Sequence, residues 1–337
     1  SSLNGLIVIH PKDLPLTTLY AIDQYLLKGG KLIVFTDELS VFDNPPQNDQ
    51  NAYAYKRSSQ IDLLTDAWGL KRIKDSVLCD KNLATEVSYP NAAGVQETVM
   101  HPTLLTAEPK YFKTDSRVTM GLQNLIIYYS GVYDKIPKEG LNIEELVFTS
   151  KQNAEIMTFQ VMSSEPSKVQ SLCDKIFTEK GTRDPKGIVF KATGKFSTAF
   201  PEGKPKAEVD PKAPPAPEVA DTSVPLKVST GNPIAILVTD VDMLNDKIMF
   251  RQNQFGQTTN SNYPFIQNLV EMTMGNEDLI SIRTKAVNNR PFTVLEDIKK
   301  KAEENTQKEI KAYQEKAEEA NIELGKFLPA RSGVKIP

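Results

Sequence analysis

Residues 5–37 read GLIVIHPKDLPLTTLYAIDQYLLKGGKLIVFTD, and this stretch decides the fold class. Residues 6–9 and 31–36 are short apolar runs rich in β-branched side chains, which is typical of strands buried on both faces. Between them, Leu19, Ile22 and Leu26 recur three and four residues apart, which predicts a helix with one buried face. Two buried strands joined by a helix form a right-handed βαβ crossover. The stretch therefore predicts an α/β fold.

The same two patterns continue along the chain. They predict strands at 77–79, 124–129, 145–150, 187–196, 233–239 and 279–282, and helices at 58–69, 167–177 and 262–274. The polar residues 37–57 predict a long surface loop, and the signals in residues 84–140 are mixed. Together these elements predict one α/β domain over residues 1–290, with a mostly parallel sheet flanked by helices.

Two segments differ from this domain in composition. Residues 201–225 hold seven of the 22 prolines and few large apolar side chains, which predicts a flexible loop. Residues 291–328 are dense in Glu and Lys and predict a long charged C-terminal helix, followed by a tail at 329–337.

The charged helix carries a narrow apolar stripe. Its members are Ile310, Tyr313, Ala317, Ala320, Leu324 and Phe327. The stripe is equally consistent with a helix that lies on its own domain and with one that projects toward a partner. In the second case Ile310, Tyr313, Ala317 and Leu324 would bind the partner, and a second copy of the chain would give a homo-oligomer.

Charge and hydropathy exclude several classes of protein. The chain has 337 residues, with 40 Lys and Arg against 43 Asp and Glu, a net charge of −3. No basic block is present, so nucleic acid is not an expected partner. The longest apolar runs are far shorter than the roughly 20 residues of a membrane-spanning helix. The sequence begins without Met or a signal peptide, and we expect it to be part of a longer protein whose membrane segments lie elsewhere.

Motifs of nucleotide, metal and nucleophile chemistry are absent from the sequence. There is no G-x-G, no P-loop, no C-x-x-C, no H-E-x-x-H and no G-x-S-x-G, and the only histidines are His10 and His101. We therefore predict no cofactor, no metal and no catalytic residue. The enzyme alternative is an amidotransferase-like hydrolase in which Cys79 is the nucleophile and a histidine its base, although the role of a small buried hydrophobic residue suits Cys79 better. Whether Cys79 and Cys173 are free thiols stays open.

Acidic residues follow two of the predicted strands. Asp37 and Glu38 follow the strand at 31–36, and Asp240 and Asp242 follow the strand at 233–239. If these strands are neighbours, the carboxylates converge on one edge of the sheet and form a site for a cation or a polar ligand. Acidic residues in such positions also cap the next helix, so both roles stay open.

Two further residues complete the predicted ligand-binding set. His10 lies at the carboxyl end of the first strand, where open α/β sheets place ligands, although it also suits a turn before Pro11. Arg283 lies near the last predicted strand and can grip a carboxylate or a phosphate, although a surface role is as probable.

Several stretches resemble one known family when they are taken in order. They are residues 5–14, 18–25, 29–37, 63–69, 194–201, 240–244, 278–283 and 290–293. Together they are similar to the extracytoplasmic region of auxiliary proteins of bacterial ABC-type transport systems, a family that includes the gliding-motility-associated ABC transporter component. The resemblance spans about residues 4 to 325.

This resemblance implies both a fold and a role. The implied fold is an α/β layer like that of class I glutamine amidotransferases without its catalytic residues. The implied role is a non-catalytic module on the periplasmic or extracytoplasmic face of the cytoplasmic membrane, attached to it only through segments absent from this chain. Its partners would be a permease and an ATPase, and the module would mediate assembly or bind a ligand. A small-molecule or glycan binder is the remaining alternative.

Overall fold

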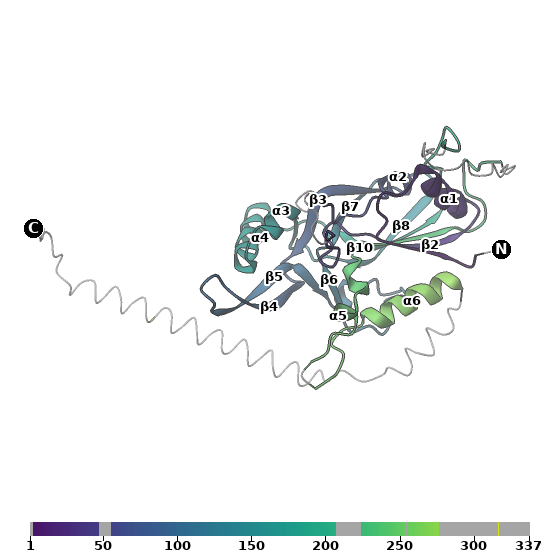
Figure 1. The fold of residues 1–337 in the computed structure, drawn as a ribbon. Coiled ribbons are helices and arrows are strands. Elements are labelled where there is room, and N and C mark those ends of the chain that lie inside the picture. The colour runs from purple at the N-terminus through teal and green to yellow at the C-terminus, as the bar shows by residue number, and fades with distance from the viewer. Residues whose placement is uncertain (1–2, 47–54, 207–223, 254, 276–315, 317–337) are drawn as a thin grey trace, which may run out of the picture. The chain divides into compact units, whose positions relative to one another are not determined.

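The computed structural model describes residues 3–46, 55–206, 224–253, 255–275 and Lys316 (Figure 1). The predicted strand at 279–282, the charged helix at 291–328 apart from Lys316, and the tail at 329–337 lie outside the described residues, as do Arg283, Ile310, Tyr313, Ala317 and Leu324. Most of the Pro-rich segment lies outside them too. None of the helices in the described part combines the length and the apolar character that a membrane span needs.

A five-stranded sheet forms the centre of the domain, in the order β1-β2-β11-β10-β8. Its strands are β1 (Leu6–Ile9), β2 (Lys31–Phe35), β11 (Ile234–Val238), β10 (Gly187–Gly194) and β8 (Leu141–Phe148). The predicted βαβ unit is confirmed: β1 and β2 pair in parallel and are joined by α1 (Leu16–Leu27). β1 alternates between half-buried and exposed residues because it is an edge strand, so the prediction that both its faces are buried was wrong.

The sheet is mixed rather than mostly parallel. β2 pairs in parallel with β1 and β11, but β10 runs antiparallel to both β11 and β8. The predicted parallel dominance was therefore wrong, and the described part gives no support for an amidotransferase-like layer. A buried apolar run is the same in a central antiparallel strand as in a parallel one, so the sequence pattern could not set the direction.

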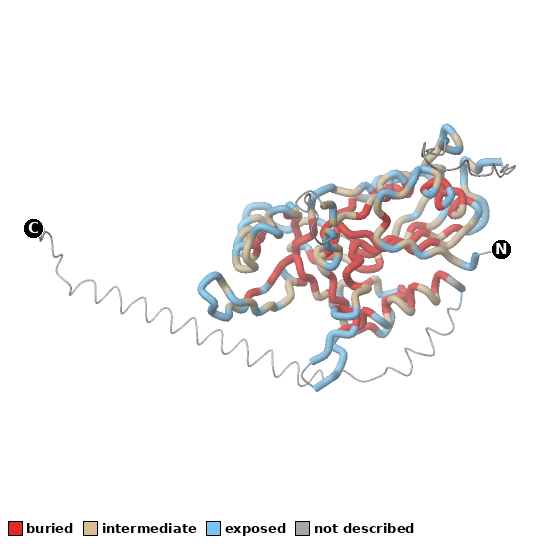
Figure 2. The backbone as a smooth tube through the Cα atoms, in the orientation of Figure 1, coloured by how far each residue is buried: buried red, intermediate tan, exposed pale blue. Residues whose placement is uncertain are grey.

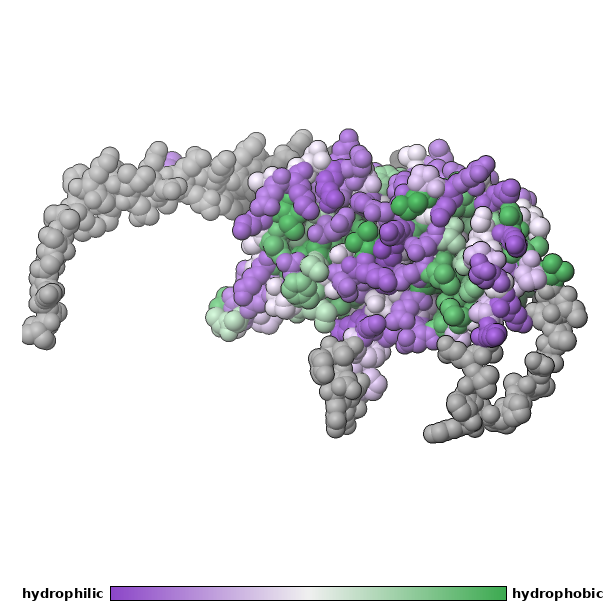
Figure 3. Space-filling view, turned by 90° about the horizontal axis from the view of Figure 1, so that it is seen from above, coloured by the Kyte–Doolittle hydropathy of each residue, from purple (hydrophilic) through white to green (hydrophobic). Residues whose placement is uncertain are grey.

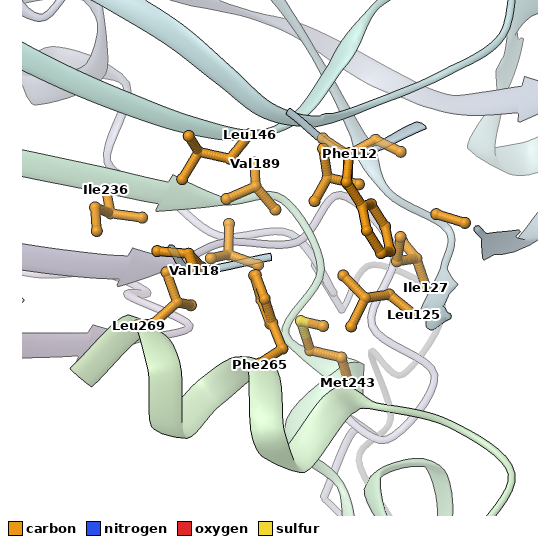
Figure 4. Packing of buried hydrophobic residues seen from close by; sticks show 14 of the residues in the cluster. Phe112, Val118, Leu125, Ile127, Leu146, Val189, Ile236, Met243, Phe265 and Leu269 are labelled. Carbon is orange, nitrogen blue, oxygen red and sulfur yellow. The ribbon is translucent and has the colours of Figure 1, made fainter. Parts of the chain in front are cut away.

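Helices cover both faces of the central sheet. Leu32 and Val34 of β2 point toward α1 and α2 (Asp62–Ala67), in one apolar cluster with Leu26 and Trp68. The alternate residues of β2 and β11 join a second cluster, on the side of α6 (Asn262–Met274). In Figure 4, Phe265 and Leu269 of α6 point toward Ile236, Val189 and Leu146 of the sheet. Alternation along each strand thus supplies two separate cores.

Two three-stranded antiparallel sheets extend the domain. One has the order β7-β3-β9, with β7 (Gly131–Lys135), β3 (Leu70–Asp80) and β9 (Asn153–Met157). The other has the order β4-β5-β6, with β4 (Ala84–Pro90), β5 (Gln96–Ala107) and β6 (Leu125–Tyr128). The short helix α3 (Thr158–Met162) and α4 (Pro166–Lys180) follow β9, and α5 (Asp246–Met249) precedes α6. Figure 2 shows buried backbone where the three sheets meet.

Candidate functional site

The carboxyl ends of β2 and β11 bring three carboxylates together. Phe35 pairs with Val238 at the end of the parallel ladder, so Asp37 and Asp240 leave the sheet side by side. Asp242 joins them, and all three offer ligand oxygens within 4.8 Å of one another. The predicted convergence is confirmed for these three carboxylates but not for Glu38, the fourth residue of that prediction. We call Asp37, Asp240 and Asp242 the aspartate cluster.

Every carboxylate oxygen of the aspartate cluster accepts a hydrogen bond from the protein. The two oxygens of Asp37 accept from the backbone N–H groups of Leu39 (2.8 Å) and Val241 (3.0 Å). Those of Asp240 accept from the N–H groups of Tyr128 (2.8 Å) and Met243 (3.2 Å). Those of Asp242 accept from the Ser40 hydroxyl (2.6 Å) and the Val41 N–H (2.7 Å).

These bonds tie together the loops that leave the sheets. Asp240 connects the end of β11 to the end of β6, and the same junction holds a bond from the Gly131 N–H to the Thr239 carbonyl. The Ser130 and Thr239 hydroxyls are 2.6 Å apart beside it. The aspartate cluster therefore acts as a structural joint between the sheets. The donors to its oxygens account for the structural role, and the three carboxylates also have the spacing of the cation site that the sequence left open.

Burial controls the protonation of the aspartate cluster. Desolvation raises the pKa of Asp37 and Asp240 well above the usual range, and the neighbouring carboxylates raise them further. Desolvation also raises the pKa of Asp242, although its hydrogen bonds with Ser40 and Val41 oppose the shift. Three buried carboxylates this close cannot all ionise without strong repulsion. We therefore expect the cluster to retain a proton at pH values where exposed aspartates have lost theirs.

Glu38 belongs to a separate, buried ion-pair group. Arg72 Nη1 donates to Glu38 Oε2 (2.8 Å), while Arg72 Nε and Nη2 donate to the two oxygens of Asp62 (2.6 and 2.9 Å). Burial raises the pKa of Glu38 even though Arg72 opposes the shift. The second Glu38 oxygen accepts from the Asp75 N–H at 2.6 Å.

Asp75 marks an irregularity in β3. Its φ is +57°, and the pairing register of β3 with β7 shifts between Ile73 and Val77. A non-glycine residue in this left-handed region is strained by about 1 to 3 kcal/mol, and such strain gathers at functional sites. Here the bond from the Asp75 N–H to Glu38 stabilises the bulge.

His10 ends β1 and bonds to two side chains. Its Nδ1 shares a hydrogen bond of 2.8 Å with Ser59 Oγ, and its Nε2 lies 3.0 Å from Asp43 Oδ2. Burial raises the pKa of Asp43, but hydrogen bonds from Lys12, Tyr55 and His10 outweigh this and lower it to about 2. The residue types and their order match a Ser-His-Asp relay.

The surroundings of Ser59 favour a structural use of this relay. Ser59 is only 2% exposed, and its Oγ already accepts the Asp37 N–H at 2.9 Å. Its own N–H donates to the Asp37 carbonyl at 2.8 Å. A nucleophile needs an open approach for substrate and donors for the oxyanion. The three side chains instead connect the chain on either side of residues 47–54 to the ends of β1 and β2.

The two cysteines lie together in the core between β3 and α4. Cys79 and Cys173 are free and fully buried, and the hydrogen bond with Cys173 and the burial raise the pKa of Cys79 well above its usual range. His101 is buried on another sheet beside Thr103, and burial lowers its pKa to about 4. A neutral, inaccessible thiol does not suit nucleophilic catalysis.

A hollow of about 540 Å³ opens beside the ion-pair group. We call it the rim hollow. Its lining is mainly charged and polar: Glu38, Leu39, Tyr55, Lys56, Arg57, Ser58, Gln60, Asp62, Arg72, Lys74, Asp75, Thr158 and Met162. Arg72 is compensated by Glu38 and Asp62. Lys74 also pairs with Asp62 at 3.6 Å. Together the four cations of the lining exceed its three carboxylates by one positive charge.

The rim hollow adjoins an exposed apolar surface on α3. Phe159 and Met162, one helical turn apart, are each 59% exposed, and Met157 just before the helix is 47% exposed. We call these three residues the α3 patch. Elsewhere, on the face drawn in Figure 3, apolar residues lie in small patches among polar ones. The association of an apolar patch with a charged hollow is typical of a surface that binds another protein.

Comparison with known proteins places the chain in a family. The model of a family described as an ABC-type uncharacterized transport system matches residues 1–271. The chain belongs to this family. The resemblance found in the sequence to the auxiliary ABC-transport family is thereby confirmed. None of the curated proteins matches the chain.

The structure describes five of the six predicted ligand-binding residues, while Arg283 lies outside the described residues. The structure brings Asp37, Asp240 and Asp242 together, and it places Glu38 and His10 in separate bonded groups beside them. Sequence reasoning missed Arg72, Asp62, Asp43, Ser59 and the α3 patch. For Arg72 no signal existed, because it lies in the charged start of β3 with Lys71, Lys74 and Asp75.

Proposed function

We propose that this chain is a non-catalytic, extracytoplasmic module of an ABC-transporter-associated membrane protein, and that it binds a subunit of the transport complex. Membership of the transport-system family supports the link to such a complex. The single observation that carries the binding role is the rim hollow beside the α3 patch. The gliding-motility-associated component, which the sequence resembles, indicates which kind of transporter to test first.

The α3 patch supplies the apolar part of the proposed interface. Exposed Phe and Met side chains are energetically unfavourable on a free surface, and methionine-rich surfaces adapt to varied partners. Because α3 has only five residues and Val161 anchors its other face in the core, Phe159 and Met162 stay directed outward. The patch can therefore bury a partner's apolar side chain without rearrangement of the domain.

The rim hollow supplies the charged part. Lys56 and Lys74 are exposed, Lys74 pairs with Asp62 at 3.6 Å, and Arg57 donates to Asn44 Oδ1 at 3.3 Å. This positive excess is complementary to carboxylates, which favours a partner segment with an apolar anchor flanked by acidic residues. The permease of the complex is the expected source of such a segment, because an extracytoplasmic surface reaches the membrane subunit directly and the ATPase only through it.

The proposal that the module is non-catalytic rests on the surroundings of two candidate nucleophiles, Ser59 and Cys79. Ser59 is enclosed by Asp37 and His10, and Cys79 faces Cys173 in the core. Arg72 has its guanidinium engaged by two carboxylates and cannot reorganise cheaply around a reacting group. These contacts favour a binding module over the hydrolase, and the exposed apolar side chains of the α3 patch favour a protein over a glycan.

The test uses the full-length protein in native membranes. The double variant Phe159→Asp with Met162→Asp introduces charge into the α3 patch, and Val95→Asp on the β4–β5 turn is the matched control because Val95 is 61% exposed. We expect the wild type and the control to co-purify ABC permease or ATPase subunits, identified by mass spectrometry, and the double variant to lose them. Unchanged co-purification of the subunits by the double variant would refute the proposed interface.

Placement outside the cytoplasm is tested separately by thiol labelling. Both native cysteines are buried, so a single Val95→Cys substitution creates one accessible thiol. A membrane-impermeant maleimide should label it in intact cells. Labelling that appears only after lysis would place the module in the cytoplasm.

A further inference from the structure

The segment between α5 and α6 forms a short hairpin that carries three exposed aromatic rings. Phe255 at its tip is 77% exposed, and Phe250 and Tyr263 at its base are each 44% exposed. Phe250 and Tyr263 pack against each other with ring centroids 5.4 Å apart. We call the described residues between 250 and 263, that is 250–253 and 255–263, the aromatic hairpin. It runs as an exposed loop below α5 and α6 in the view of Figures 1 and 2.

Hydrogen bonds within the hairpin fix its tip. Asn253 is the centre: its Oδ1 accepts the N–H groups of Phe255 (2.9 Å) and Gln257 (3.1 Å), and its own N–H donates to the Gln257 carbonyl (2.9 Å). Gly256, with φ of +75°, completes the turn by donating to the Asn253 carbonyl. An ordered turn cannot fold over its own Phe255, so the ring stays outward.

The base of the hairpin is attached to the core. Ile248 and Met249 just before it are buried, and Asn260 donates to the Ile248 carbonyl at 2.8 Å. The Thr259 N–H donates to the Arg251 carbonyl at 2.9 Å. The rings are thus presented on a pre-organised support, which lowers the entropy that binding would cost.

The aromatic hairpin contains a positively charged residue and no negatively charged one. Arg251 is the only charged residue from Phe250 to Val270, in a chain that carries 43 acidic residues. A convex apolar tip with one cation at its base and no carboxylate is complementary to an anionic lipid surface, in which aromatic rings lie at headgroup depth.

The same contacts argue against a sugar ligand. Small-molecule and glycan sites are concave, whereas this tip projects. The amide groups that would bind hydroxyls are already used, since Asn253 Nδ2 donates to Gln257 Oε1 and Asn260 bonds within the domain.

We propose that the aromatic hairpin is a peripheral membrane contact in which Phe255 enters the headgroup region of an anionic bilayer and Arg251 binds its phosphates. This contact is separate from the α3 patch and needs no transporter subunit. It would orient the domain on the membrane while the α3 patch engages a partner.

The single tryptophan makes a direct test possible. Trp68 is buried beside α2 and gives a constant background, so Phe255→Trp reports on the hairpin alone. Val95→Trp is the matched control on another exposed turn. Each variant is titrated with protein-free vesicles of phosphatidylcholine, with and without phosphatidylglycerol, and then with brominated lipid as a quencher.

We expect a blue shift and bromine quenching for Phe255→Trp with the anionic vesicles and neither for Val95→Trp. Adding Arg251→Gln should lower the partition coefficient about fivefold, the equivalent of about 1 kcal/mol per cation. Equal quenching in the two variants, or no shift at the highest lipid concentration, would overturn the proposal. If Phe255→Ser abolishes co-purification of the transporter subunits and Phe255→Trp shows no vesicle binding, the hairpin is a protein contact instead.

Discussion

The substitution Asp240→Asn tests the proton that we assign to the aspartate cluster. Asp240 accepts two backbone N–H groups, from Tyr128 and Met243, and an amide offers only one acceptor atom. One buried N–H then faces an NH₂ group, which costs about 1 to 3 kcal/mol. The substitution also removes the repulsion that raises the pKa of Asp37.

The two effects have different dependence on pH. The raised pKa values mean that the folded cluster holds protons that the unfolded chain, with aspartate pKa values near 3.9, has released above about pH 4. The unfolded state then binds fewer protons, so stability is fully present below that pH and falls as pH rises through the folded pKa values. The slope is about 1.4 kcal/mol per pH unit for each retained proton. In Asp240→Asn this slope should shrink.

Urea unfolding followed by Trp68 fluorescence measures the difference at several pH values. We expect Asp240→Asn to be less stable than the wild type at pH 4 to 5, and we expect the two curves to converge as pH rises. Asp184→Asn, at an exposed position, is the control and should run parallel to the wild type. If the difference in unfolding free energy between Asp240→Asn and the wild type is constant from pH 4 to 8, the assignment of a retained proton is refuted.

Three further outcomes follow from the same contacts. Glu38→Ala leaves an Arg72 nitrogen and the Asp75 N–H without acceptors, so it should cost about 3 to 5 kcal/mol in urea unfolding, against a smaller loss for Glu38→Gln; equal losses would contradict the ion-pair account. Cys79 and Cys173 should resist iodoacetamide in the native protein and react after unfolding, as mass spectrometry can show; rapid native labelling would mean that the core is open. Millimolar Mg²⁺ or Ca²⁺ and EDTA should leave the melting temperature unchanged, because the cluster oxygens have protein donors; stabilisation that grows with ion concentration would point to a bound cation.

The sequence predicted the parts of the fold in which one pattern allows one structure. The βαβ unit at 6–35 was readable because two apolar runs and a helical period follow each other within about thirty residues. The helix 262–274 was readable from its apolar spacing and from Gly275, which ends it with φ of +86°.

The strands of the antiparallel sheets could not be predicted from the sequence in this way. β3 begins with a charged run that looks like loop but forms strand because Arg72 is paired with Glu38 and Asp62. β5 starts with exposed polar residues and becomes buried only in its second half. β3 depends on β7 and β9, which are distant in sequence, and β5 is buried by packing that periodicity cannot detect.

The candidate site was also predictable only in part. The convergence of Asp37, Asp240 and Asp242 was predictable because parallel neighbours end at one edge. Their structural role was not predictable, because the groups that donate hydrogen bonds to these carboxylates come from loops and from β6. The α3 patch was hidden because five residues are too few to show a helical period.

Site-specific photo-crosslinking from Phe159 tests the central claim most directly. A photoreactive phenylalanine analogue replaces Phe159 in the full-length protein, and Val95 carries the same analogue in the control. After irradiation of intact cells, we predict a crosslink from position 159 to an ABC permease subunit and none from position 95. The absence of a subunit crosslink at position 159, or the same crosslinks from both positions, would contradict the account.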